Sequence, residues 1–278
     1  MYPYVIVDVF TDTPLEGNPA AIVTSAPGIP AGRMQRIARE FNLSETVFVL
    51  PAENTGDARV RIFTPSTELP FAGHPVLGTA FVLAEAAGLQ TIRLETGAGV
   101  VPVELARENG RITFGRMRQP VPTWEPYEQA DRLLAALGAK SSGLPAEAYR
   151  NGPRHVYVEL ASEQAVASLQ PDMGALAKLP GIAVSCFAGG GSRWKSRNFA
   201  PALGVPEDPA TGSAAGPLAV HLARHGRIGF GQEIEIGQGA EIGRPSRLYA
   251  RASGRADRID SVEVAGAAVI TARGELHA

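Results

Sequence analysis

The second half of the chain repeats a pattern of the first half, and this repeat constrains the fold more than any other feature. Arg61-x-Phe63-x-Pro65 followed by Glu68-x-Pro70-x-x-Gly73 recurs as Arg197-x-Phe199-x-Pro201 followed by Glu207-x-Pro209-x-x-Gly212. The two closing glycines are 139 residues apart, which is half of the 278-residue chain. Agreement at this offset predicts a duplicated structural unit, with three extra residues between the two blocks of the second copy.

Each copy of the pattern leads into a segment that is apolar around its whole circumference. Residues 74–87 and 213–223 carry almost no charged side chains, whereas a surface helix would have one polar face. Helices of this composition are buried on all sides. Gly88 ends the first helix. The first residue of the second helix is not determined, because Pro217 would fit best in a first turn and the helix could start late or bend there.

Short segments with strand character surround these two helices. Strands are predicted at 2–10, 46–50, 58–63, 91–95, 100–106, 111–114, 155–160, 182–187, 233–236, 247–252 and 262–270, and further helices at 32–41, 131–137 and 172–178. We therefore predict an α+β fold of two similar halves, each a mostly antiparallel curled sheet wrapped around a central buried helix.

A proline-rich passage at 120–126 suits a link between the halves. The predicted domains are residues 1–125 and 126–263, with the tail of about 264–278 assigned to the first half and the active site between the two domains.

Composition excludes several classes of function. A content of 45% apolar and 19% charged residues is typical of a folded globular protein. With a net charge of -2 and no dense cluster of Lys and Arg, nucleic acid is not an expected partner. No run of 18 apolar residues is present, so we expect no membrane span. The first ten residues lack the basic region of a signal peptide and Cys186 is the single cysteine, which together favour a cytoplasmic location.

The starts of the two buried helices are candidate anion sites. In each copy a loop ends in glycine immediately before the helix, at Gly73 and at Gly212. If the halves face each other, the free N–H groups and positive dipole ends of both helices can receive a carboxylate or a small phosphate. Capping of the second helix by Thr211 or Ser213 is an equally good explanation of the same spacing.

Three residues near these helix starts can move protons. Glu45 interrupts an apolar approach to a strand, where burial would raise its pKa and suit it to general acid–base catalysis. An exposed or capping carboxylate is an equally good interpretation. His74 stands at a helix start, where its cationic form is disfavoured, and Asp208 would by itself be a simple helix cap.

The remaining motifs do not predict a cofactor or a metal. Gly189-Gly190-Gly191 lacks the Lys and Ser/Thr of a P-loop, and Gly237-x-Gly239-x-x-x-Gly243 lacks dinucleotide-binding spacing. His221 and His225 have the i, i+4 spacing of some zinc ligands without the intervening glutamate. Cys186 is expected to be a small buried residue of a strand. We expect no cofactor and no metal.

Five motifs taken together resemble the PhzF-like phenazine-biosynthesis family. They are Gly17-Asn-Pro19, Asn42-Leu-Ser-Glu-Thr46, Arg61-Ile-Phe-Thr-Pro65, Glu68-Leu-Pro-Phe-Ala-Gly-His-Pro75 and Glu207-Asp-Pro-Ala-Thr-Gly-Ser-Ala214. Further segments extend the resemblance over essentially the whole chain, including Tyr149-Arg-Asn-Gly-Pro-Arg-His155 and Gly243-Arg-Pro-Ser-Arg247.

The resemblance implies a fold like that of diaminopimelate epimerase and a homodimeric, cofactor-free isomerase. Its implied substrate is a hydroxylated cyclohexadiene amino acid, trans-2,3-dihydro-3-hydroxyanthranilate, which is converted to a ketone on the way to phenazine antibiotics. By the same resemblance, the expected catalytic residues are Glu45, His74 and Asp208, and the expected substrate-binding residues are Asn18, Ser44, Gly73, Gly212 and Ser213.

Three other functions compete with this isomerase. A racemase or epimerase with two opposed thiols is excluded, because Ala72 and Thr211 stand at the positions that resemble the thiol sites. An isomerase of another small carboxylic acid remains open. A non-catalytic protein that binds a small acid is a third possibility, against which the joint presence of Glu45, His74 and Asp208 argues.

Overall fold

The computed structural model describes residues 1–179 and 181–277. Its helices are α1 (Ala31–Phe41), α2 (Gly73–Ala87), α3 (Ala130–Leu137), α4 (Glu163–Ala167), α5 (Met173–Leu176) and α6 (Gly212–Arg224). The strands before residue 120 are β1 (Tyr2–Val9), β2 (Asn18–Val23), β3 (Glu45–Leu50), β4 (Ala58–Phe63), β5 (Glu68–Leu69), β6 (Thr91–Thr96), β7 (Gly99–Glu108) and β8 (Arg111–Gln119). The later strands are β9 (Thr123–Pro126), β10 (Glu147–Arg150), β11 (Arg154–Glu159), β12 (Ala183–Gly190), β13 (Arg193–Ala200), β14 (Val205–Asp208), β15 (Glu233–Gln238), β16 (Ser246–Arg255), β17 (Arg258–Gly266) and β18 (Ala268–Leu276).

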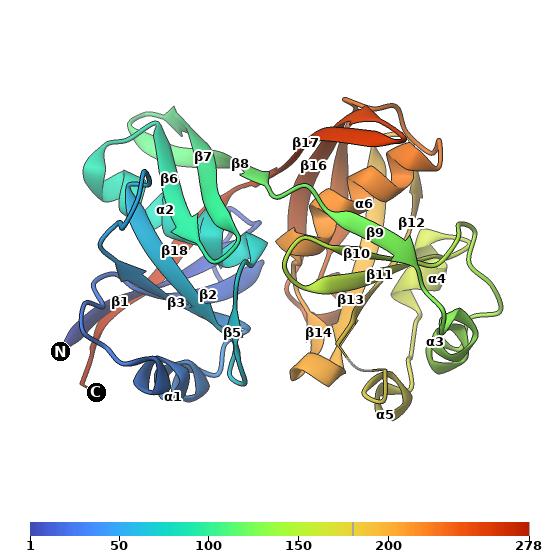
Figure 1. The fold of residues 1–278 in the computed structure, drawn as a ribbon, viewed down its shortest axis with the longest axis horizontal. Coiled ribbons are helices and arrows are strands. Elements are labelled where there is room, and N and C mark those ends of the chain that lie inside the picture. The colour runs from blue at the N-terminus through green and yellow to red at the C-terminus, as the bar shows by residue number, and fades with distance from the viewer. Residues whose placement is uncertain (180, 278) are drawn as a thin grey trace.

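Two lobes lie side by side, each with one central helix, α2 in the first and α6 in the second (Figure 1). The strand pairs β1–β2, β2–β3, β3–β4 and β4–β6 in the first lobe are matched by β10–β11, β11–β12, β12–β13 and β13–β15 in the second. The second and fourth pairs of each series are parallel, and the first and third are antiparallel. The duplicated α+β fold predicted from the repeat is therefore confirmed.

The repeated residues form the same contacts in both halves. Arg61 and Glu68 make a two-pronged ion pair at 2.6 and 2.7 Å, and Arg197 and Glu207 make one with both bonds at 2.8 Å. In each copy the guanidinium also lies over the phenylalanine of the motif, 5.2 Å from the Phe63 ring centre and 4.9 Å from that of Phe199. These contacts join β4 to β5 in the first half and β13 to β14 in the second, and each of the shorter strands leads into a central helix.

The two central helices are buried as their composition predicts. α2 ends at Gly88, which adopts a left-handed conformation with φ of 69°, as glycine readily does. α6 begins at Gly212 and keeps Pro217 inside it. Because proline has no N–H, the carbonyl of Ser213 lacks the usual donor four residues further on.

The chain passes between the lobes after β8 and again after β17 (Figure 1). β8 pairs with β17 in antiparallel register, β18 returns to pair with β1, and β9 pairs with β10. The single strand expected at 262–270 is wrong: β17 ends at Gly266 and β18 starts at Ala268, so the chain changes partner between them. The domain division after residues 125 and 263 stays a prediction, and Ala278 of its tail lies outside the described residues.

Strands β2, β5, β9, β10, β13 and β14 and helix α4 were not predicted, and β18 was predicted only in its first three residues. The remaining elements lie where the sequence placed them within a few residues. Over residues 1–179 and 181–277, no helix has both the length and the apolar character needed to cross a membrane.

Candidate active site

The starts of α2 and α6 meet back to back where the lobes touch. A Cβ atom placed on Gly73 would lie 2.6 Å from the Gly212 carbonyl carbon and 2.8 Å from the Ser213 nitrogen. No side chain larger than hydrogen fits such an approach, which explains glycine at both helix starts. The residues just before the helices, Ala72 and Thr211, make no capping hydrogen bond with their side chains. Capping by the Thr211 side chain therefore does not account for the motif, and the first N–H groups of each helix have no acceptor within the helix itself.

Glu45 and His74 face each other beside these helix starts. Glu45 is the first residue of β3, and α1 is stopped just before it by Asn42 in a left-handed conformation. Glu45 Oε2 lies 3.3 Å from His74 Nε2, and their side chains are 14% and 4% exposed. Neither atom has a hydrogen-bond partner among the described residues. Two buried polar atoms thus point at each other unsatisfied, which is costly unless a third molecule completes them.

Burial sets the protonation of this pair. Burial raises the pKa of Glu45 well above its usual value, and the negative charge of Asp208 raises it further. Burial lowers the pKa of His74 to about 3, so its imidazole is neutral at physiological pH. Asn18 Nδ2 lies 3.2 Å from His74 Nδ1, but its two hydrogens already go to Asp208 Oδ1 and the Ala210 carbonyl oxygen, each at 2.8 Å, so this contact leaves both neutral tautomers of His74 open. The expectations of a raised pKa for Glu45 and an uncharged His74 are confirmed.

Asp208 joins the two lobes through its carboxylate. Its Oδ1 atom accepts hydrogen bonds from Asn18 Nδ2 at 2.8 Å and from Ser44 Oγ at 3.3 Å, both in the first half. Its Oδ2 atom accepts from Thr211 Oγ1 at 2.6 Å in the second half. Burial raises the pKa of Asp208 to about 6 even though these three donors oppose the rise. The Asp208 carboxylate therefore orders the site through its three hydrogen bonds, and it also changes protonation near pH 6.

All eight predicted site residues come together at this junction. Asn18, Ser44, Glu45, His74 and Asp208 are linked by the contacts above, and Gly73, Gly212 and Ser213 form the adjoining helix starts.

Sequence reasoning missed the side chains behind them. Gln238 donates to the Asp208 carbonyl oxygen at 2.8 Å and to Thr211 Oγ1 at 2.9 Å, which holds the loop before α6. His155 Nε2 lies 3.0 Å from Ser213 Oγ. Both come from strands distant in the sequence, and no local spacing marks them.

A second buried cluster lies at the other end of α6. Glu147 Oε2 accepts hydrogen bonds from Tyr149, His221, Arg224 and His225 at 2.8–3.2 Å. Glu147, His221 and His225 have metal-ligand atoms within 4.8 Å of one another. The Arg224 guanidinium already bonds to the same carboxylate oxygen at 2.8 Å, so the cation of this cluster is arginine.

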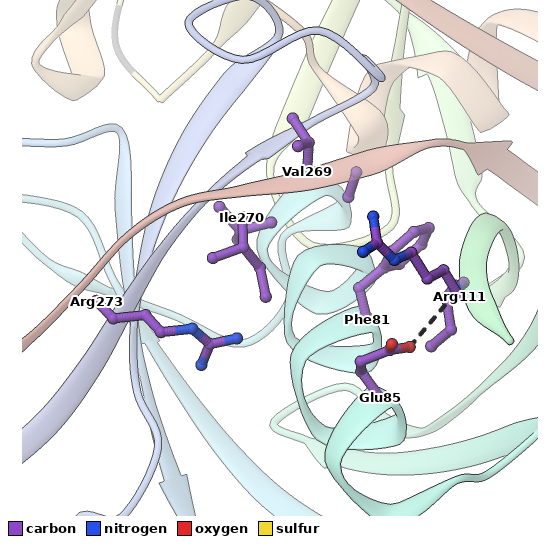
Figure 2. Close-up of a pocket in the computed structure, with 9 residues that line it drawn as sticks. Phe81, Glu85, Arg111, Val269, Ile270 and Arg273 are labelled. Carbon is purple, nitrogen blue, oxygen red and sulfur yellow. Dashed lines mark hydrogen bonds between the residues drawn. The ribbon is translucent and has the colours of Figure 1, made fainter.

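A surface hollow of about 370 Å³ lies apart from the candidate site, near the later turns of α2 (Figure 2). It is lined by Phe81, Glu85 and Arg111 and by β18 residues that include Ile270 and Arg273. Glu85 accepts a hydrogen bond from the Ile112 backbone there at 3.3 Å. None of the eight predicted site residues lines it, so it is not the candidate active site.

The chain is similar in sequence and in structure to several known proteins. The chain is 54% identical to the trans-2,3-dihydro-3-hydroxyanthranilate isomerase of Pseudomonas aeruginosa, over the full length of both chains. A phenazine biosynthesis protein of the PhzF family from Bacillus anthracis superposes with a TM-score of 0.84 at 28% identity, covering 99% of this chain and 98% of that one. A hydroxyproline epimerase from Agrobacterium vitis superposes with a TM-score of 0.67 at 14% identity, covering 99% and 90%, which shows likeness of fold alone.

The fold is thus the two-lobed, epimerase-like class in which two helix starts meet between duplicated halves. The family model described as "Phenazine biosynthesis-like protein" matches residues 7–274. The chain belongs to this family.

Proposed function

We propose that this chain is an isomerase that converts trans-2,3-dihydro-3-hydroxyanthranilate to its ketone tautomer in phenazine biosynthesis, without a cofactor. The observation that carries the proposal is the buried Glu45 carboxyl, which has a raised pKa and an unsatisfied oxygen beside two helix N-termini. The relative named as this isomerase, 54% identical over its whole length, supplies the choice of substrate.

The reaction moves one proton within the substrate. Ionised Glu45 removes the proton from ring carbon C3, and the electron pair of that bond moves into the conjugated diene. The protonated Glu45 then returns a proton to C1 on the same face, and the enol at C3 relaxes to the ketone. Electrons are only redistributed, so the step balances without an oxidant or a reductant. A carboxyl that must be ionised first and protonated midway works best with a pKa near neutrality, and burial moves Glu45 in that direction.

The surrounding residues bind and orient the ring. The N–H groups at Gly73 and Gly212 and the Ser213 hydroxyl receive the substrate carboxylate, because helix N-termini stabilise negative charge. Neutral His74 offers its Nε2 atom, which has no hydrogen-bond partner among the described residues, to a polar substituent of the ring. Asp208 keeps Asn18 and Ser44 in place, assists in orienting the amino group, and raises the pKa of Glu45 through its charge.

An isomerase of another small acid is the second candidate, because the helix N-termini would hold any carboxylate. Inversion of a stereocentre by two cysteines has no support, since Cys186 is buried in β12 and Ala72 and Thr211 precede the helices. A cytoplasmic homodimer belongs to the proposal as well. Light scattering coupled to size-exclusion chromatography should give twice the chain mass of 29.2 kDa.

The experiment is to incubate chelator-treated protein with trans-2,3-dihydro-3-hydroxyanthranilate in D₂O and to follow the ring protons by NMR. We expect conversion without added cofactor and deuterium at C1, with lower incorporation if Glu45 returns part of the original proton. Absence of conversion by folded protein would refute the proposed substrate. Screening other small carboxylates for thermal stabilisation would then test the second candidate.

A further inference from the structure

Behind the start of α6, a buried histidine contacts the serine that the proposed function places on the substrate. His155 lies in β11, is 2% exposed, and reaches Ser213 Oγ with its Nε2 atom at 3.0 Å. Ser213 is itself 5% exposed and is the second residue of α6. The contact links a strand of the second lobe to the helix end that touches Gly73.

The environment of His155 determines which ring nitrogen carries the proton. Burial lowers the pKa of His155 to about 4, so the ring is neutral at physiological pH and has a single N–H group. Its Nδ1 atom is buried and has no hydrogen-bond partner among the described residues. An unpartnered buried N–H is rarer in proteins than an unpartnered acceptor. The proton is therefore favoured on Nε2, where it has Ser213 Oγ as its acceptor.

This assignment fixes the direction of the Ser213 hydroxyl. When Ser213 Oγ accepts a hydrogen bond from His155, its own hydrogen is left for another acceptor. Over the described part of the chain, Ser213 Oγ has no other hydrogen-bond contact. The opposite tautomer would make Ser213 donate to His155 and turn an oxygen lone pair towards the substrate carboxylate, which would repel it.

We propose that His155 is a positioning residue that holds Ser213 as a hydrogen-bond donor to the substrate carboxylate. The proposal deepens the proposed function and rests on it for the identity of the anion. Since His155 acts through Ser213 and does not touch the reacting carbons, its loss should weaken carboxylate binding. KM should rise more than kcat falls, as expected when an interaction is made equally in the bound substrate and in the transition state.

The tautomer can be tested without any substrate. In protein labelled with ¹⁵N-histidine, two-bond ¹H–¹⁵N correlation spectra distinguish Nε2-protonated from Nδ1-protonated imidazole, and His155→Gln identifies the signal by its disappearance. We expect the Nε2-protonated form at pH 7. An Nδ1-protonated or doubly protonated ring would overturn the inference, whatever the protein catalyses.

The effect on binding is tested with 3-hydroxyanthranilate, a stable aromatic acid that keeps the carboxylate, amino and hydroxyl groups of the proposed substrate. By calorimetry, His155→Leu should weaken its binding about tenfold, the scale of one hydrogen bond to a charged group. His155→Gln, which offers an N–H donor again, should recover most of the loss. His225→Gln, a histidine at the other end of α6, is the matched control and should bind within about twofold of the wild type.

A double-mutant cycle with Ser213→Ala separates positioning from general damage. If His155 acts through Ser213, then His155→Leu should cause no further loss of affinity once Ser213 is alanine. Independent, additive losses would refute the proposal and indicate a structural role for His155. If the wild type binds 3-hydroxyanthranilate but does not turn over the proposed substrate, the proposed function fails while the cycle still decides the role of His155. Failure to bind this acid at all would refute both.

Discussion

Two buried clusters of glutamate and histidine lie near opposite ends of α6. The pKa of the glutamate is shifted upwards in one cluster and downwards in the other. At the candidate site, Glu45 Oε2 and His74 Nε2 lie 3.3 Å apart and have no hydrogen-bond partner among the described residues. At the far end of α6, a single oxygen of Glu147 accepts hydrogen bonds from four side chains. Burial raises the pKa of Glu45, whereas the donors around Glu147 lower its pKa despite opposing burial.

The difference shows that residue type does not identify a catalytic carboxyl. A carboxylate with a full set of donors is stabilised in its charged form and resists protonation. A buried carboxylate with too few donors exchanges protons readily, which is what an acid–base catalyst must do. Replacing one carboxylate at a time therefore tests this difference, because each replacement changes a single cluster.

The largest expected effect is that of Glu45→Gln on turnover. Glutamine keeps the size of the side chain but cannot accept a proton from C3, so kcat should fall at least about a thousandfold. Circular dichroism and 3-hydroxyanthranilate binding should remain close to those of the wild type. Retention of more than about a tenth of the rate would show that Glu45 is not the base.

Glu147→Gln should do the reverse, lowering stability and sparing activity. The substitution removes the negative charge that Arg224 and His225 contact, leaving buried positive charge without its counter-ion. The unfolding free energy should fall by about 2 kcal/mol, less than for a fully buried ion pair because water reaches part of the cluster. Urea unfolding measures this loss, and kcat should stay within about twofold. A severe loss of kcat in the folded variant would mean that the two ends of α6 are coupled.

Asp208→Asn should move the acidic limb of the pH–rate profile. The charge of Asp208 raises the pKa of Glu45, so its removal lets Glu45 ionise at lower pH. The limb of kcat/KM should move to lower pH, even though the rate itself also falls because asparagine keeps only one acceptor oxygen for the three donors Asn18, Ser44 and Thr211. Glu147→Gln is the control and should leave the limb in place. A limb that does not move would show that Asp208 does not tune Glu45.

The cluster around Glu45 could be predicted from the sequence, whereas the cluster around Glu147 could not. The repeat ending at Gly73 and Gly212 placed two helix starts together, and the structure confirms their contact. Glu45 stood out because it interrupts an apolar strand approach. Glu147 did not, because His221, Arg224 and His225 lie at the C-terminal end of α6, 74 to 78 residues further along the chain, and only folding brings them to Glu147.

Similar limits explain three of the short missed strands, β5, β10 and β14, and also His155. β10 and β14 are four residues each, and β5 has two, which is too short for an alternating pattern to emerge. The boundary between β17 and β18 depends on which partner strand each meets, namely β16 and β8 for one and β1 for the other. Local sequence does not encode such a change of partner, and the pairing of His155 with Ser213 is non-local in the same way.

The smallest expected effect is on the pH dependence of stability, where the two glutamates should act with opposite signs. The pKa of Glu45 is raised on folding, so its contribution to stability is complete below the unfolded pKa of about 4.3 and is lost as pH rises through the folded value. The pKa of Glu147 is lowered, so its contribution is present above the unfolded pKa and is lost as pH falls. Compared with the wild type, Glu45→Gln should therefore gain a little in Tm towards neutral pH, by less than Glu147→Gln loses there. The deficit of Glu147→Gln should shrink in acid. Melting curves between pH 2 and 8 measure both trends, and a Glu45→Gln variant that is least stable at neutral pH would show that this carboxylate is satisfied after all, like Glu147.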